Sequence, residues 1–264
     1  MKNEYLFELK DFHVWVGEKE ILKGLNLRIK QGSVHVIFGP NGSGKTTLLN
    51  AVMGFSGYRV TGQILFHGKD ITRLPVNERA RLGIGISFQR PPAIHGVKLR
   101  HLIATSAKTN GRLLDEYARK LNLVDFLERD VNVGFSGGEI KRAELLQLLL
   151  QDPDLIFLDE PESGVDLENI ALIGEYTNHL LGKKLRPQED KTMKELRREV
   201  SKSGLLITHT GHILNYVNAD VGHILMGGRI ACEANPQEML NTLQECGFQE
   251  CYRCFRKEED HVKR

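Results

Sequence analysis

The stretch from Gly39 to Thr46 holds residues whose types and spacing can bind phosphate. It fits the pattern G-x-x-x-x-G-K-[ST], in which glycines let backbone N–H groups turn toward a phosphate. Lys45 can reach the β- and γ-phosphates of a nucleotide, and the Thr46 hydroxyl can bind Mg²⁺. The sequence therefore predicts a nucleotide site. Its contacts are expected from Gly39, Pro40, Asn41, Gly42, Ser43, Gly44, Lys45, Thr46 and Thr47.

The segments on either side of this loop are those that a phosphate site requires. Residues 34–38 are an apolar run typical of a buried strand, and residues 46–53 are predicted to form a helix that Gly54 closes. Strand, glycine turn and helix N-terminus together place partial positive charge at the anion. The structural alternative, a glycine turn without a ligand, does not account for this order of elements.

Three further apolar strands are predicted to end at polar residues: Gln89, the pair Asp159-Glu160, and His209. In a parallel sheet, ligands bind outside the carboxyl ends of the strands, so we expect these side chains to converge on the phosphate loop. Asp159 can hold Mg²⁺ beside Thr46, and Glu160 can polarise an attacking water. Gln89 can sense Mg²⁺ and the γ-phosphate, and His209 can bind the γ-phosphate and the water. Together they indicate nucleotide hydrolysis.

A second glycine turn, from Phe135 to Glu139, opens the predicted helix 139–150. A serine and two glycines at a helix N-terminus can bind an anion, although alone they are more often a structural cap. One subunit does not need two cradles for one γ-phosphate. Two subunits related by a twofold axis can use them in pairs, so we expect an ATP-dependent homodimer contact. Lys141 follows this turn, and we expect its amine to hold Glu160 away from the water in the resting monomer.

Over roughly residues 4–245, the sequence resembles the ABC-type ATPase family. The resemblance implies ATP and Mg²⁺ as cofactors, catalysis by Glu160, His209 and Gln89, and metal binding by Thr46, Gln89 and Asp159. Val16 matches the position of the family's adenine-stacking residue. The matching motifs are Gly39–Thr46 (Walker A), Gln89 (Q-loop), Phe135, Ser136, Gly137, Gly138 and Glu139 (signature, acting in trans), Leu155–Asp159 with Glu160 (Walker B), Ser163 to Asp166 (D-loop) and His209 (switch).

A narrower resemblance is to the SufC group, the ATPases of the Suf iron–sulfur cluster assembly machinery. It is carried by Val60–Gly62, Phe88–Val97, Phe135–Arg142 and Glu162–Asp166, and by residues 207–216 and 220–225. It implies SufB/SufD-like scaffold proteins as partners. The alternatives are the ATP-binding subunit of a membrane transporter, which has the same site chemistry, and a regulator that binds nucleotide without hydrolysing it. The Asp159-Glu160 pair argues against the regulator.

We therefore expect an α/β fold of the ABC-type ATPase class: a P-loop parallel-sheet core, an antiparallel β subdomain and a small α-helical subdomain. A single domain spans residues 1–264. Its predicted parts are a core with the β subdomain (1–89 and 135–245), a helical subdomain (about 90–134), a charged helical insertion (182–203) and a C-terminal tail (246–264). Strands are expected at 5–9, 12–16, 25–29, 60–67, 83–89, 155–160, 205–209, 223–226 and 229–232, and helices at 74–81, within 98–130, at 167–181 and at 236–244.

Composition limits the other function classes. A net charge of +2 does not indicate nucleic-acid binding. No apolar run approaches the roughly 20 residues that cross a bilayer, and the N-terminal stretch lacks a signal-peptide core. We expect a cytoplasmic protein without direct membrane insertion. Cys251 and Cys254 have metal-ligand spacing, with Cys232 and Cys246 near in sequence, so reduced thiols and a metal or sulfur-handling role both stay open.

Overall fold

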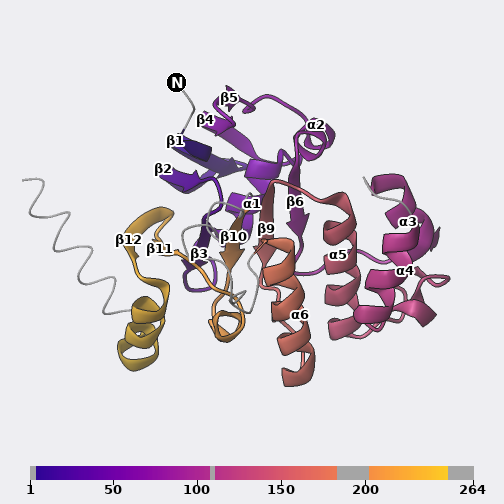
Figure 1. The fold of residues 1–264 in the computed structure, drawn as a ribbon. Coiled ribbons are helices and arrows are strands. Elements are labelled where there is room, and N and C mark those ends of the chain that lie inside the picture. The colour runs from indigo at the N-terminus through magenta and orange to yellow at the C-terminus, as the bar shows by residue number, and fades with distance from the viewer. Residues whose placement is uncertain (1–3, 108–110, 183–201, 249–264) are drawn as a thin grey trace, which may run out of the picture.

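The computed structural model describes residues 4–107, 111–182 and 202–248. In that part of the chain a six-stranded sheet has the order β12-β11-β3-β10-β9-β6 (Figure 1). All neighbouring strands are parallel except β11 and β12. The strands are β3 (Val34–Phe38), β6 (Ile84–Ser87), β9 (Leu155–Asp159), β10 (Ser203–Ile207), β11 (Val221–Met226) and β12 (Arg229–Ala234).

The apolar strands are buried on both faces, as the uninterrupted runs of the sequence predict for a parallel sheet. Every residue of β9 is buried, and successive residues face different cores. Ile156 and Leu158 pack in the core beneath the helices. Leu155 and Phe157 pack in a second core, beneath the antiparallel subdomain. The sheet is therefore the middle layer, and its position fixes the strand ends that carry the site.

An antiparallel sheet of order β2-β1-β4-β5 covers one face (Figure 1). It comprises β1 (Tyr5–Val16), β2 (Lys19–Lys30), β4 (Arg59–Phe66) and β5 (Lys69–Asp70). The sequence predicts two strands, at 5–9 and 12–16, where the structure has the single strand β1. The irregularity at Asp11 resembles a break between strands when only the sequence is considered. Asp11 has a φ of 45° inside the strand. Its carbonyl lies so close to Gly62 that a Cβ there would be 2.1 Å away, so only glycine fits opposite the bulge.

Helices cover the other face or join the two sheets. They are α1 (Lys45–Met53), α2 (Val76–Arg81), α5 (Gly137–Gln151), α6 (Leu167–Leu180), the 3₁₀ turn η2 (His212–Asn215) and a helix over residues 236–248. The fold class predicted from the sequence is confirmed: a mixed α/β core with a parallel sheet and an antiparallel β subdomain.

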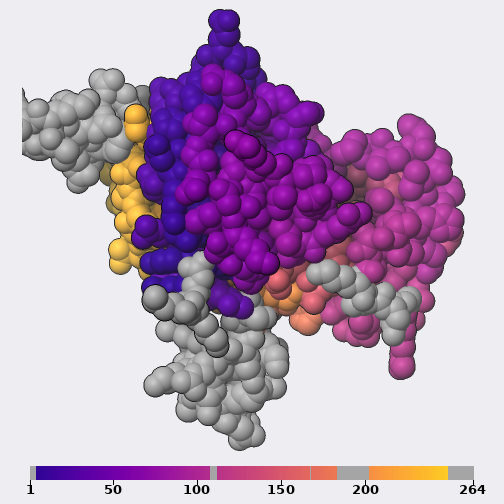
Figure 2. Space-filling view, turned by 90° about the horizontal axis from the view of Figure 1, so that it is seen from above, coloured from indigo at the N-terminus to yellow at the C-terminus, as the bar shows by residue number. Residues whose placement is uncertain are grey.

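The segment predicted to be a helical subdomain forms a lobe beside the N-terminal half (Figures 1 and 2). It contains α3 (Leu99–Ser106), α4 (Gly111–Lys120) and η1 (Val124–Phe126). It also contains a short antiparallel pair, β7 (Ile94–Lys98) with β8 (Asp130–Val131), where helical periodicity predicted helix up to residue 130. The Asp130 carboxylate accepts bonds from Gly96 N (2.9 Å) and Lys98 Nζ (2.8 Å), which favours the strand pair over another helical turn.

The predicted insertion over 182–203 and the tail over 246–264 lie mostly outside the described residues. So do Cys251 and Cys254, whereas Cys232 and Cys246 are described and exposed. Within the described ranges, no group of three or more metal-ligating side chains comes together. None of the helices in those same ranges is long and apolar enough to cross a membrane.

Candidate active site

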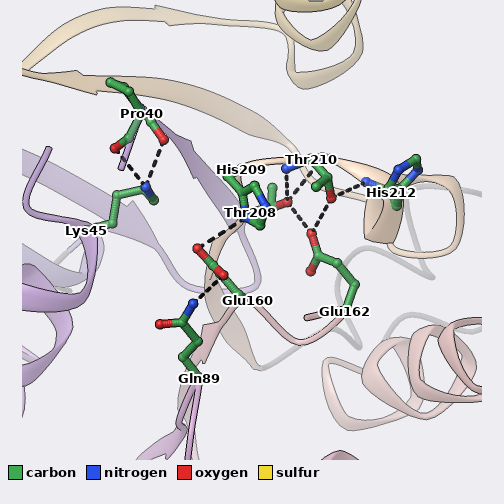
Figure 3. Close-up of polar contacts among 11 residues, drawn as sticks. Pro40, Lys45, Gln89, Glu160, Glu162, Thr208, His209, Thr210 and His212 are labelled. Atoms are coloured by element: carbon green, nitrogen blue, oxygen red, sulfur yellow. Dashed lines mark hydrogen bonds and ion pairs between the residues drawn. The ribbon is translucent and has the colours of Figure 1, made fainter. Parts of the chain in front are cut away.

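The phosphate loop lies between β3 and α1, as predicted. A Cβ on Gly39 would lie 2.5 Å from the carbonyl oxygen of Leu225, so the loop can pass β11 only with glycine there. Gly44 has a φ of 104° and precedes the first residue of α1. Lys45 donates to the carbonyls of Gly39 (2.8 Å) and Pro40 (3.1 Å) (Figure 3). Its amine is thereby held inside the loop. Burial lowers the pKa of Lys45, opposed by the carboxylates of Glu160 and Asp159.

Asp159 ends β9 and is 3% exposed. Burial raises the pKa of its carboxyl, and a hydrogen bond from the Thr46 side chain opposes that shift. Its Oδ1 is buried and accepts no hydrogen bond from the described residues. A free carboxylate oxygen beside a hydroxyl is a donor set that Mg²⁺ accepts, so these residues fit the ion. When bound there by Asp159 and Thr46, Mg²⁺ would neutralise charge on the phosphates.

Side chains that follow the neighbouring strands contact the carboxylate of Glu160. Gln89 Nε2 donates to its Oε2 (2.6 Å), and His209 Nδ1 lies 3.3 Å from its Oε1 (Figure 3). Glu160 is 5% exposed and has a φ of 48°, a conformation that costs free energy for a residue other than glycine. Its amide donates to Ile207 O at 3.0 Å, which holds it in that conformation. The side chain is therefore fixed between the ends of β6 and β10.

The signature turn begins α5. Ser136 Oγ accepts from Glu139 N (3.3 Å), and Glu139 Oε2 accepts from Ser136 N (2.7 Å), so the two residues cap their own helix. A Cβ on Gly137 would lie 2.3 Å from Gly164 O, which means that the turn packs directly on the loop before α6. These contacts position the signature turn against the predicted D-loop.

Two aromatic rings and one arginine hold the start of the signature, which sequence reasoning missed. The rings of Phe126 and Phe135 meet edge to face at 4.9 Å. The Arg129 guanidinium lies 5.0 Å from the centre of the Phe135 ring and also donates to Gly134 O (3.2 Å). Arg129 and Phe135 lie seven residues and one residue before the serine cap, and no fixed spacing marks such a cluster in sequence.

The D-loop residues have backbone and capping roles in this chain. Asp166 is the N-cap of α6 and accepts from Asn169 N at 2.9 Å. The amide of Ser163 donates to Glu160 O at 3.0 Å. The D-loop is therefore joined directly to the loop that carries Glu160.

The predicted adenine position, Val16, is the last residue of β1 and is 45% exposed. Its neighbour Trp15 is engaged elsewhere: the Arg59 guanidinium lies 4.1 Å from the indole centre, and the His13 ring stacks on it at 5.7 Å. Of the two residues, Val16 is the more exposed, and its contact with adenine stays a prediction.

The expectation for Lys141 is wrong in this structure. Its amine lies 3.7 Å from Glu144 Oε2 and donates to Phe88 O, rather than pairing with Glu160. Glu144 also accepts from Ser87 Oγ (2.9 Å) and Phe88 N (2.8 Å). Sequence patterns do not single out Glu144, because a glutamate within a helix of apolar pattern is usually exposed. This buried pair anchors the strand end that leads to Gln89.

Removing the cation of this pair is expected to destabilise the fold. Burial raises the pKa of Glu144 and lowers that of Lys141. We expect Lys141→Met to cost about 3–5 kcal/mol, because it leaves a buried carboxylate without its counter-ion. The pKa of Glu144 in the folded state lies above its usual value of 4.5. The contribution of this group to the free energy of unfolding is therefore fully present below pH 4.5 and is lost as the pH rises through the pKa of the folded state. Urea unfolding at acid and neutral pH measures this, and the deficit should be larger at neutral pH, where Glu144 is ionised and Lys141 of the parent is charged. Equal deficits would contradict the assignment.

The fold and the site define a class of protein, the ATP-binding cassette: a parallel-sheet core with a phosphate loop, a Walker B carboxylate pair, and a separate signature turn. Residues 22–163 match the ABC transporter family, and the chain belongs to that family.

Several relatives match over most of their length. Vegetative protein 296 of Bacillus subtilis is 36% identical over 91% of this chain and 90% of its own. A Streptococcus pyogenes protein named Probable ABC transporter ATP-binding protein is 38% identical over 92% of this chain and 93% of its own. The Escherichia coli protein named Probable ATP-dependent transporter SufC is 35% identical, over 92% and 97%. Among solved structures, an ATP-binding cassette of an ABC transporter in its ADP conformation has a TM-score of 0.67 at 26% identity. The match covers 95% of this chain and 99% of the chain in that structure.

Proposed function

We propose that this chain is a Mg²⁺-dependent ATPase that dimerises on ATP and drives a conformational change in a SufB/SufD-like scaffold for iron–sulfur cluster assembly. The observation that carries the hydrolytic part is the placement of Glu160. Its carboxylate is held by Gln89 and His209 and follows the aspartate that fits Mg²⁺. A regulator that only binds nucleotide does not require an oriented base at this point.

The chain's own residues divide the reaction among them. The loop amides and Lys45 bind the phosphates, and Thr46 and Asp159 hold Mg²⁺. Glu160 accepts a proton from the attacking water while His209 and Gln89 fix the direction of its carboxylate. The signature turn of a second subunit, Ser136 to Gly138, would cover the γ-phosphate from the other side. Closure of the dimer then couples the nucleotide to movement of a partner.

The scaffold partner is supported by the relative named SufC, whose match covers nearly all of both chains. The second candidate is the ATP-binding subunit of a membrane transporter. It is supported by the Streptococcus pyogenes relatives, whose name describes that role. The site chemistry is the same in both, so only the partner distinguishes them.

The partner is tested by isolating the full-length chain from its native cells, after mild cross-linking, and identifying the associated proteins by mass spectrometry. We expect SufB- or SufD-like scaffolds in near-stoichiometric amounts. An integral membrane permease in their place would overturn the Suf role and favour the transporter. A parallel assay of phosphate release from ATP, with and without EDTA, tests the hydrolytic part separately.

A further inference from the structure

Glu162 joins two loops of the candidate site, and the sequence motifs assign it no role of its own. Its Oε1 accepts hydrogen bonds from the hydroxyl of Thr208 and from that of Thr210 at 3.1 Å (Figure 3). Glu162 is 6% exposed, and Thr208 is completely buried. The two threonines flank His209, and Glu162 lies between Glu160 and the D-loop. One carboxylate oxygen therefore connects the loop after β9 with the loop after β10.

The same hydroxyl fixes the backbone around His209. Thr208 Oγ1 donates to Glu162 and accepts from the amides of Thr210 (3.2 Å) and Gly211 (2.8 Å). Gly211 has a φ of 74° and packs against Leu240, so the loop turns sharply at its far end. The imidazole of His209 extends from a loop that is held on both sides, and it lies 3.3 Å from Glu160 Oε1.

The other oxygen of Glu162 shows that this acid is not explained by packing. Its Oε2 is buried and has no hydrogen-bond partner among the described residues. A buried carboxylate that leaves one oxygen without a hydrogen bond is costly, and an apolar side chain would fill the same space at a lower cost. The acid is, however, well suited to holding two hydroxyl donors at once.

The backbone carries the connection on to the D-loop. Ser163 N donates to Glu160 O (3.0 Å), and Val165 N donates to Glu162 O (3.3 Å). Gly164 in turn touches the signature turn at Gly137. The D-loop is thereby connected to Glu162, and through the two threonines to the loop of His209.

We propose that Glu162 is a positioning residue that makes the D-loop and the His209 loop move as one unit, so that the contact between His209 and Glu160 depends on where the D-loop lies. This inference rests on the proposed hydrolysis of ATP, since it assigns a way of regulating that site. Glu162 acts through Thr208, Thr210 and His209 and does not touch the nucleotide.

The first test is a set of matched threonine variants, measured by steady-state ATP hydrolysis. Thr208→Val keeps the shape and removes the hydroxyl, whereas Thr208→Ser keeps the hydroxyl. We expect kcat to fall roughly tenfold in Thr208→Val, with KM for ATP within about twofold and near-parent kinetics in Thr208→Ser. Thr210→Val, at a less buried position, should lower kcat in the same direction. A parent kcat in both valine variants would overturn the proposal.

A double-mutant cycle separates positioning from general support of the fold. If Glu162 acts through His209, adding Thr208→Val to a His209→Ala background should lower kcat no further. Losses that multiply would show that the threonine acts independently of the histidine, and would contradict the proposal.

Hydrogen exchange tests the connection even without turnover. In the full chain without nucleotide, Thr208→Val should speed amide exchange at residues 210–211 and also at 163–166, while Thr208→Ser should not. Faster exchange confined to 210–211 would overturn the coupling. If the parent chain releases no phosphate, the proposed ATPase function fails, and the exchange result still decides whether the two loops are joined.

Discussion

Glu160→Gln is expected to reduce phosphate release by a factor of 10² to 10⁴, roughly the contribution of a positioned general base. Glutamine has nearly the shape of glutamate and can still meet Gln89 and His209, but its amide cannot accept the proton of the attacking water. ATP binding should stay at the parent level, because the contacts of Lys45 and Thr46 are untouched. The variant is therefore expected to accumulate as an ATP-bound dimer.

Phosphate release and light scattering with and without ATP measure these two outcomes. Glu78→Gln makes the same chemical change at an exposed position on α2 and should behave as the parent. Hydrolysis at the parent rate in Glu160→Gln would show that this carboxylate is not the base. A variant that is inactive and stays monomeric with saturating ATP would contradict the dimer.

The layout of the core and of the phosphate loop could be predicted from the sequence because both depend on local patterns. Uninterrupted apolar runs require strands buried on both faces, and β3 and β9 are such strands. Parallel strands bring their carboxyl ends to one edge. That rule was sufficient to predict that Gln89, Glu160 and His209 would meet, and the structure places Gln89 and His209 within hydrogen-bonding range of the Glu160 carboxylate.

The errors concern residues whose role depends on partners far away in sequence. Glu144 lies 57 residues from Ser87, and its burial cannot be read from its own helix. Lys141 pairs with Glu144, three residues along the same helix, and the burial of both residues, which the helical pattern does not predict, decides this pairing. Glu162 lies in a recognised motif, but its importance depends on threonines 46 and 48 residues later. Sequence spacing identified the groups that face the nucleotide and missed the buried groups that hold them.

Complementation between two inactive variants is the sharpest test of a composite site. Lys45→Ala should lower hydrolysis at least 100-fold, because it removes the cation that meets the β- and γ-phosphates. Gly137→Ala should do so too, because its Cβ would lie 2.3 Å from Gly164 O and displace the signature turn. If each site combines the loop of one subunit with the signature of the other, a mixed dimer has one intact site.

An equimolar mixture then regains activity by simple counting. Half of the dimers are mixed and each has one of its two sites intact, so about a quarter of the parent rate is expected. Phosphate release from the mixture, compared with each variant alone, measures this. Lys45→Ala mixed with Glu160→Gln is the matched control. One subunit contributes both Lys45 and Glu160 to a site, so every dimer in this mixture is left without an intact site. Recovery only in the first mixture requires that the signature acts across the dimer, whereas no recovery in either mixture means that each chain completes its own site.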